Sequence, residues 1–157
     1  MYENKTKGFK MLKSAFTMIE LVFIIVVLGI LAGVAVPRLA VTRDDATITK
    51  LRADVASIRS GIGLERSKAM MEGNLPAWNA KTATEKLGVR FSNVLQGPVA
   101  VGNDRNGWTF NDDGTFTACA GGRCATFRFL NADETINGIE YKRNSFVCVS
   151  GDCTLFE

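Results

Sequence analysis

The feature that most constrains this chain is an apolar run near its N-terminus, Met18 to Val36, in which the single ionisable residue is Glu20. As an α-helix the run would be roughly 28 Å long, close to the thickness of the hydrocarbon core of a bilayer. A carboxylate costs about 2.5–3.5 kcal/mol at the membrane centre and less near the edge, so Glu20 predicts a positively charged partner. No residue within the run can supply it.

The charges on either side of the run predict its orientation. Arg38 and Arg43 follow it, whereas four lysines precede it, namely Lys5, Lys7, Lys10 and Lys13. The positive-inside rule therefore places the N-terminus in the cytoplasm and the residues after Pro37 outside. The formal net charge of +3 comes entirely from these four lysines and Glu3, so the rest of the chain is neutral and predicts no nucleic-acid partner.

Histidine is absent from the sequence, which removes the commonest general base and the commonest metal ligand. A Ser-His or Cys-His nucleophile is therefore excluded. The carboxylates are scattered over polar segments, without a pair that would form an acid–base couple. We expect no catalytic residues and a protein that is not an enzyme.

Two ordinary interpretations of the apolar run leave Glu20 without a purpose. One is a secretory signal cleaved after Ala35, where Gly33-Val34-Ala35 offers small residues, which would release a soluble domain. The run is longer than the apolar region of a typical signal, and a carboxylate has no role in a discarded peptide. The other is a single-pass anchor that holds a periplasmic binding domain and never polymerises.

A third interpretation supplies the missing partner. The stretch from Lys13 to Leu21, KSAFTMIEL, followed by the apolar run and Pro37, resembles the prepilin signal of type IV pilins and type II secretion pseudopilins. The resemblance implies cleavage between Ala15 and Phe16 and N-methylation of Phe16; the family usually has Gly where this chain has Ala15. The new α-amine is largely protonated near neutral pH and would pair with Glu20 of a neighbouring subunit.

The membrane segment also carries a helix-packing pattern. Gly29 and Gly33 form a G-x-x-x-G spacing, which lets helix backbones approach closely in lipid. Pro37 cannot donate a helix hydrogen bond and is expected to kink or loosen the helix. We expect these three residues to serve helix packing between subunits.

Past Pro37 the pattern becomes that of an amphipathic helix. Apolar residues recur every three or four positions, as on one face of a helix: Ile48, Leu51, Val55, Ile58 and Ile62. We expect the helix to end at about Gly73. Two heptads are too few for a coiled coil, so we expect the stripe to pack on the chain's own sheet.

The C-terminal half reads as a small β-rich head. Residues 74–83, with Pro76, predict an irregular connection, and Thr84 to Leu87 a helical turn. Short segments between turn residues then predict antiparallel strands, namely WTFN, TFTAC, CATFRFL, IEYK, SFVCV and CTLF, with Asp113-Gly114 as a hairpin turn.

The predicted fold is α+β and pilin-like: a long N-terminal helix, transmembrane in its first half, packed on a small C-terminal antiparallel sheet. We divide the chain into a cytoplasmic leader at 1–15, a transmembrane and assembly segment at 16–37, an amphipathic helix at 38–73 and a globular head at 74–157.

The four cysteines form two copies of the pattern C-x-x-G-x-C, Cys119 to Cys124 and Cys148 to Cys153. Each copy fits a hairpin with a two-residue turn, which brings its two cysteines about 4.5 Å apart between Cα atoms, within reach of a disulfide. The predicted compartment is oxidising. We therefore expect the disulfides Cys119–Cys124 and Cys148–Cys153, with a four-thiolate zinc site as the weaker alternative because its spacings would be wide.

Some pseudopilins of the resembled family bind calcium in a head loop. The acidic clusters of this chain are Asn103-Asp104, Asn111 to Asp113, and Asn131 to Glu134, and none has an EF-hand pattern. We expect solvated turns at these positions and no cofactor, with a head-loop Ca²⁺ as the weaker alternative.

We therefore expect a structural subunit of a type II secretion pseudopilus or a type IV pilus, with a subunit of a DNA-uptake pilus as an alternative. The implied partners are copies of the chain or other pilin-like subunits, the prepilin peptidase and methyltransferase, an inner-membrane assembly platform and the lipid bilayer. The expected location is the inner membrane with the head in the periplasm, and afterwards a periplasmic or cell-surface filament.

Overall fold

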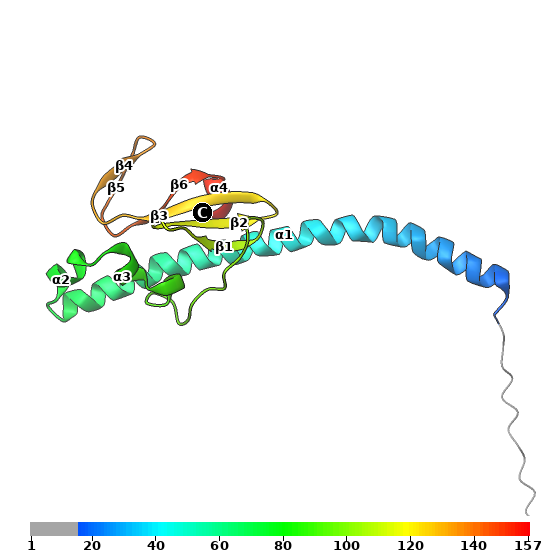
Figure 1. The fold of residues 1–157 in the computed structure, drawn as a ribbon, viewed down its shortest axis with the longest axis horizontal. Coiled ribbons are helices and arrows are strands. Elements are labelled where there is room, and N and C mark those ends of the chain that lie inside the picture. The colour runs from blue at the N-terminus through cyan, green and yellow to red at the C-terminus, as the bar shows by residue number, and fades with distance from the viewer. Residues whose placement is uncertain (1–15) are drawn as a thin grey trace, which may run out of the picture. The chain divides into compact units, whose positions relative to one another are not determined.

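The structure is a computed structural model that describes residues 16 to 157, without the side chains of residues 37 to 41. The predicted leader, residues 1–15, lies outside the described residues. The chain forms two compact units, one ending at Ala40 and the other spanning Val41–Glu157. The helix α1, Met18–Met71, contributes its first part to one unit and its second part to the other (Figure 1).

The second part of α1 carries the predicted apolar stripe. Leu51, Val55, Ile58 and Ile62 are buried, and Ile48 packs against them from the edge of the core. These side chains share one core cluster with residues of the sheet, including Trp108 and Phe127. The stripe therefore packs against the chain's own head, as the three-and-four spacing predicts.

Gly61 is a residue of low helix propensity within α1, and a close contact with a neighbouring loop explains its presence. A Cβ atom at Gly61 would lie 1.9 Å from the carbonyl oxygen of Val94, so the helix and the 92–98 loop approach too closely for any side chain. Gly63 has open space at the same position. The helix ends as expected, since Gly73 follows Met71 with a φ of +69°.

The connection from α1 to the sheet is more regular than the sequence predicts. It contains the helices α2, Leu75–Ala80, and α3, Ala83–Leu87, and the 3₁₀ turn η1, Val89–Phe91. The expectation that residues 74–83 form an irregular connection is wrong, because most of them form α2. Pro76 is compatible with this helix because it lies in the first turn, where its missing N–H costs nothing. The buried Trp78 holds α2 against the core.

The helical turn expected at Thr84–Leu87 is confirmed by α3. Thr82 caps that helix, and its hydroxyl accepts a hydrogen bond from the Glu85 backbone while the Glu85 carboxylate accepts one from the Thr82 backbone.

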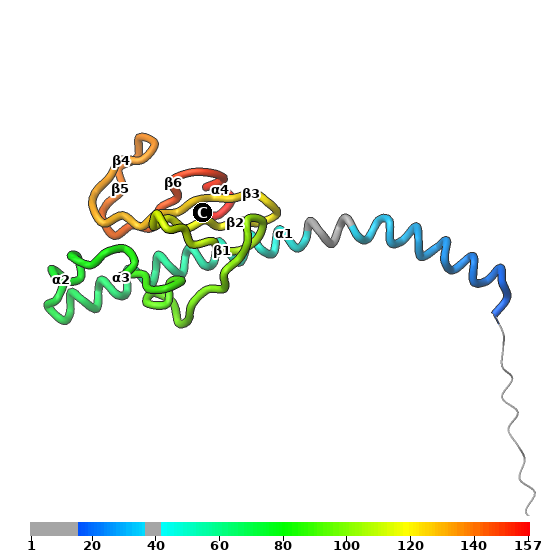
Figure 2. The backbone as a smooth tube through the Cα atoms, viewed as in Figure 1, coloured from blue at the N-terminus to red at the C-terminus, as the bar shows by residue number. Residues whose placement is uncertain are grey.

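The head contains a four-stranded antiparallel sheet in the order β1-β2-β3-β6 and a separate two-stranded hairpin, β4-β5. The strands are β1 Gly107–Phe110, β2 Thr115–Ala120, β3 Arg123–Phe129, β4 Glu134–Ile136, β5 Ile139–Tyr141 and β6 Phe146–Gly151. Figure 2 shows the β4-β5 hairpin standing apart from the larger sheet. The predicted α+β layout, a long helix on a small antiparallel sheet, is confirmed.

The strand expectations in the head need correction at two segments. The segment CTLF is not a strand but the short helix α4, Cys153–Phe156, which buries Phe156. The strand β4 was not expected, because its three residues, Glu-Thr-Ile, show too short a pattern to distinguish from a loop. The other five predicted strands and the turn at Asp113-Gly114 are present.

The core of the head is aromatic and is centred on Phe91. Its ring lies 4.8 to 5.7 Å, between centroids, from the rings of Trp108, Phe110, Phe116 and Phe146. Arg90 and Phe91 both have positive φ, 52° and 66°, a conformation that L-residues seldom adopt. The burial of the Phe91 side chain offsets that strain.

Candidate functional site

The candidate site is the first part of α1. Met18–Val36 is long and apolar enough to cross a membrane, and none of this segment is buried within the described structure. Its large apolar side chains face outward on every side of the helix, which is the opposite of a globular-protein helix with one buried stripe. The segment therefore fits membrane anchoring, with its side chains available to lipid or to other helices.

Glu20 lies in the first turn of this helix. Its carboxylate accepts hydrogen bonds from the backbone N–H and the hydroxyl of Thr17, each at 3.4 Å, and the Thr17 hydroxyl accepts one from the Glu20 backbone at 3.3 Å. This is a capping box, which satisfies N–H groups at the start of a helix. Its negative charge also lies at the end of the helix dipole that favours anions.

The capping box is a role of Glu20 that the sequence analysis missed. The signal was present, since Thr17-Met18-Ile19-Glu20 has the T-x-x-E spacing of a capping box directly before an apolar run. Its carboxylate oxygens have further acceptor capacity, so the cap leaves Glu20 able to receive a cation.

The residues around the predicted cleavage site are described only in part. Phe16 is 74% exposed and precedes the helix, whereas Ala15 and the lysines of the leader lie outside the described residues. Gly29 and Gly33 lie one helical turn apart, and a Cβ at either position would meet no atom of the described chain within 4 Å. The side chain of Pro37 is among those not described, so the predicted kink and the packing role of these residues stay predictions.

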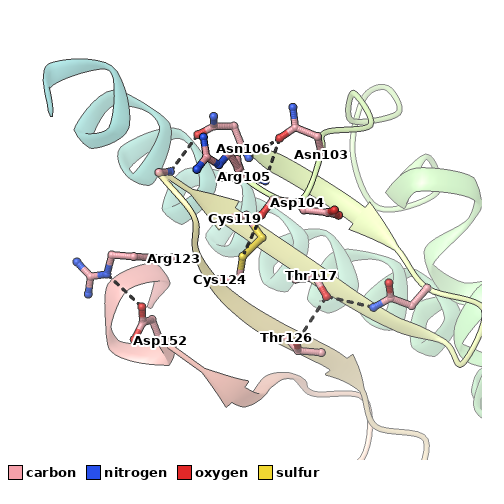
Figure 3. Close-up of a disulfide and its surroundings, with 12 residues drawn as sticks. Asn103, Asp104, Arg105, Asn106, Thr117, Cys119, Arg123, Cys124, Thr126 and Asp152 are labelled. Carbon is pink, nitrogen blue, oxygen red and sulfur yellow. Dashed lines mark hydrogen bonds and ion pairs between the residues drawn. A yellow bond between two sulfur atoms is a disulfide. The ribbon is translucent and has the colours of Figure 1, made fainter. Parts of the chain in front are cut away.

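The first cysteine pair forms the disulfide Cys119–Cys124, with 4.1 Å between the Cα atoms (Figure 3). The two cysteines are opposite each other in β2 and β3, next to the two-residue turn Gly121-Gly122, in the hairpin expected from the spacing. Both glycines have positive φ, 60° and 81°. A Cβ at Gly121 would lie 2.6 Å from a carboxylate oxygen of Asp44. Gly is therefore required at position 121 for two reasons, its positive φ and the lack of space for a side chain.

The second pair, Cys148–Cys153, is also joined, with 5.7 Å between the Cα atoms, but the expected hairpin is wrong. Ser150 and Gly151 are not a turn, because both still pair with β3, opposite Thr126 and Ala125. The disulfide instead joins the strand β6 to the first residue of α4. A two-residue turn and a strand-to-helix junction share the same C-x-x-G-x-C spacing, so the sequence alone does not separate them.

Lys86 is a buried cation that sequence reasoning did not single out, and it is 4% exposed. Its Nζ donates to the carbonyl oxygen of Asn79 at 3.3 Å and to the side-chain oxygens of Asn131 at 3.1 Å and Asn144 at 3.2 Å. It also lies over the rings of Trp78 and Phe129. Burial lowers the pKa of Lys86, and the nearby charge of Arg143 lowers it further.

The acidic clusters considered for calcium are built into their loops. Asp113 accepts hydrogen bonds from the backbone and hydroxyl of Thr115, which lower the pKa of Asp113. Asp133 accepts from the Arg143 backbone and from Lys142, and these bonds lower the pKa of Asp133. Within residues 16 to 157, groups of three or more His, Cys, Asp or Glu residues placed to hold a metal are not found.

Two curated proteins are similar to this chain. The type IV narrow pilus major component PilA5 of Thermus thermophilus is 28% identical over 104 residues, which cover 66% of this chain and 76% of that protein. The type II secretion system core protein G of Pseudomonas aeruginosa is 35% identical over 52 residues, which cover 33% of this chain and 37% of that protein. No protein-family model matches the chain, and no solved structure matches it.

The chain is similar to these two proteins, and its layout, a long helix on a small antiparallel sheet, is pilin-like. By description, the first relative is a pilus component and the second is a core protein of a secretion system. The exposed apolar helix of this chain fits membrane anchoring.

Proposed function

We propose that the pilin-like chain is a structural subunit of a type II secretion pseudopilus or a type IV pilus, assembled through its N-terminal helix. The observation that carries the proposal is a fully exposed apolar helix with a carboxylate in its first turn, four residues after the exposed Phe16. The similarity to a pilus component and to a secretion-system core protein supports it.

In this proposal, a prepilin peptidase cleaves between Ala15 and Phe16 and a methyltransferase modifies the new N-terminus. Cleavage creates an α-ammonium group at Phe16, and Glu20 of a neighbouring copy neutralises it. Each charge alone is unfavourable in lipid, so the pair favours the one stagger of adjacent helices that brings them together. Close packing at Gly29 and Gly33 then adds van der Waals contact between helix backbones.

The proposal places the unassembled chain in the inner membrane, with the N-terminus in the cytoplasm and the head in the periplasm. Its partners are then other pilin-like subunits and an inner-membrane assembly platform. The chain does no chemistry of its own in this role and is a substrate of the processing enzymes.

The mass of the mature N-terminus tests the proposal. We expect the purified mature chain to begin with methylated Phe16, identified by intact-mass measurement and N-terminal peptide sequencing. A mature chain that begins at Val36 would contradict the proposal, because it would be a released secretory domain. A chain that keeps residues 1–15 would also contradict it and would favour a single-pass anchored domain that does not polymerise.

A further inference from the structure

The chain itself contacts both outer edges of the four-stranded sheet, each at one end of the edge strand. At β1, Val101 bridges Trp108, and the Gly102 N–H donates to the Trp108 carbonyl oxygen at 2.7 Å. At β6, Arg59 Nε donates to the Phe146 carbonyl oxygen at 3.0 Å, and Phe146 to Cys148 are buried. Open strand edges template pairing with other chains, and these contacts shorten the open part of each edge.

The β4-β5 hairpin is different, because it stands apart from the sheet with both strands largely exposed (Figure 1). A two-stranded hairpin alone in water is marginally stable. Here its base is held, since Lys86 binds Asn131 before β4 and Asn144 after β5. The head therefore fixes the base of a projecting hairpin whose strands are not covered.

The pairing of this hairpin determines which backbone groups of β5 face outward. Ile136 and Ile139 flank the two-residue turn Asn137-Gly138, where φ is 51° and 81°. Residues that flank such a turn bond each other, so Ile139 and Tyr141 direct their N–H and C=O groups toward β4. Glu140 therefore directs its backbone groups away from β4, and by the same alternation the next outward residue is Lys142.

The two outward residues, Glu140 in β5 and Lys142 directly after it, carry opposite charges. The Lys142 ammonium group forms ion pairs with the carboxylates of Glu140 and Asp133, and the side chains of Glu140 and Lys142 remain 64% and 68% exposed. The neighbouring strand β4 lacks such a pattern, and its Glu134 is already paired with Arg128 of β3.

We propose that β5 pairs antiparallel with β5 of a second copy, on a two-fold axis at Tyr141. In this register Glu140 lies opposite Lys142 of the second copy, and Lys142 lies opposite its Glu140. Both are hydrogen-bonded pairs, because these residues present the outward backbone groups. The two Tyr141 residues form the central non-hydrogen-bonded pair, where Cα atoms lie about 4.5 Å apart.

The charges of Glu140 and Lys142 favour a second copy of this chain as the partner of the β5 edge. Opposite charges facing each other across strands stabilise pairing, and like charges oppose it, so this edge is complementary to itself in one register. The ladder is short, so pairing requires copies held close together, as in one membrane. The β5–β5 pairing needs two membrane-anchored copies but does not need the proposed filament.

Cross-linking of the full-length, unprocessed chain in liposomes tests the pairing. A cysteine introduced by Tyr141→Cys should form a disulfide-linked dimer under mild oxidation, since about 4.5 Å between Cα atoms is within disulfide reach. The matched control Thr135→Cys lies on the outer strand of the same hairpin. In the paired state its two copies would be about 14 Å apart, three strand spacings, and should cross-link several-fold less.

Charge exchange between two chains separates this contact from an intrachain role of the ion pair. In the Tyr141→Cys background, Glu140→Lys and Lys142→Glu should each reduce homodimer yield severalfold, because like charges then face each other. Mixing the two variants, distinguished by a mass tag, should restore the heterodimer, because every facing pair is again of opposite charge.

Equal cross-linking at positions 135 and 141, or equal yields of homodimer and heterodimer in the mixture, would overturn the pairing. Because the chain is unprocessed and no filament forms, a failure here leaves the filament proposal standing. If the chain fails to assemble into filaments, the cross-linking experiment still tests the β5–β5 pairing.

Discussion

Lys86 shows at the residue scale how a charge can be held inside a small head. Its ammonium group has three donors, and the three oxygens of Asn79, Asn131 and Asn144 accept them. The rings of Trp78 and Phe129 lie beside the same charge. Among residues 16 to 157, no carboxylate forms an ion pair with this ammonium group, so its stability depends on these neutral acceptors remaining in place.

We predict that Lys86→Met lowers the free energy of unfolding by about 1–3 kcal/mol, because acceptor oxygens lose their donor in a buried site. Chemical denaturation of the full chain in detergent micelles measures the loss. The control Lys81→Met removes an exposed lysine nearby and should change stability by about 0.5 kcal/mol or less.

The pH dependence of that difference has a defined sign. Burial lowers the pKa of Lys86 in the folded chain, so the unfolded chain binds the proton more tightly. The stability of the wild type relative to Lys86→Met should therefore rise with pH toward the unfolded value of about 10.4. A difference that shrinks as the pH is raised from neutral would contradict the burial of a charged amine.

At the scale of the element, α1 contains two nearby glycines that differ in the space available for a side chain. We predict that Gly61→Ala destabilises the head by about 1–3 kcal/mol, because its Cβ would overlap the Val94 carbonyl group. Gly63→Ala, two residues away in open space, should stabilise it by up to about 1 kcal/mol through helix propensity. Thermal unfolding of the two variants side by side checks the pair, and the same sign for both would refute it.

The elements that sequence reasoning placed correctly are those with a local signal. The stripe from Ile48 to Ile62, the hairpin at Gly121-Gly122 and the helical turn at α3 all follow from spacing or from turn chemistry. The helix α4 and the strand end at Ser150-Gly151 do not, because pairing with β3 decides them. Their local sequence is equally compatible with a hairpin.

At the scale of the whole molecule, Glu20 has two separable roles, as a helix cap and as the proposed intersubunit charge. Glu20→Gln keeps a side-chain acceptor for the cap and removes the charge, whereas Thr17→Ala removes the capping hydroxyl and keeps the charge. We predict that Glu20→Gln is still cleaved but enters filaments about tenfold less, a loss of about 1.4 kcal/mol. Thr17→Ala should assemble nearly as well as the wild type.

Quantifying each variant in purified filaments and in the membrane fraction measures this prediction. Normal incorporation of Glu20→Gln would show that its charge has no partner in the filament. An equal loss in both variants would assign the defect to the helix cap instead.

The sequence by itself determined the features that rest on local composition and spacing. These are the apolar segment with its lone carboxylate, the amphipathic continuation, the α+β plan and the pairing of four cysteines within their own motifs. Each depends on residues close together in the chain, whose physical preferences do not need the rest of the fold.

Only the tertiary structure decided the features that join distant residues. Lys86 contacts oxygens from three separate segments, and Gly61 is required by a loop more than thirty residues away. Val101 contacts the edge strand β1, and Arg59 contacts the edge strand β6. No spacing in the sequence encodes these contacts, because they arise when the helix and the strands pack around one core. The same packing leaves both strands of the β4-β5 hairpin largely exposed.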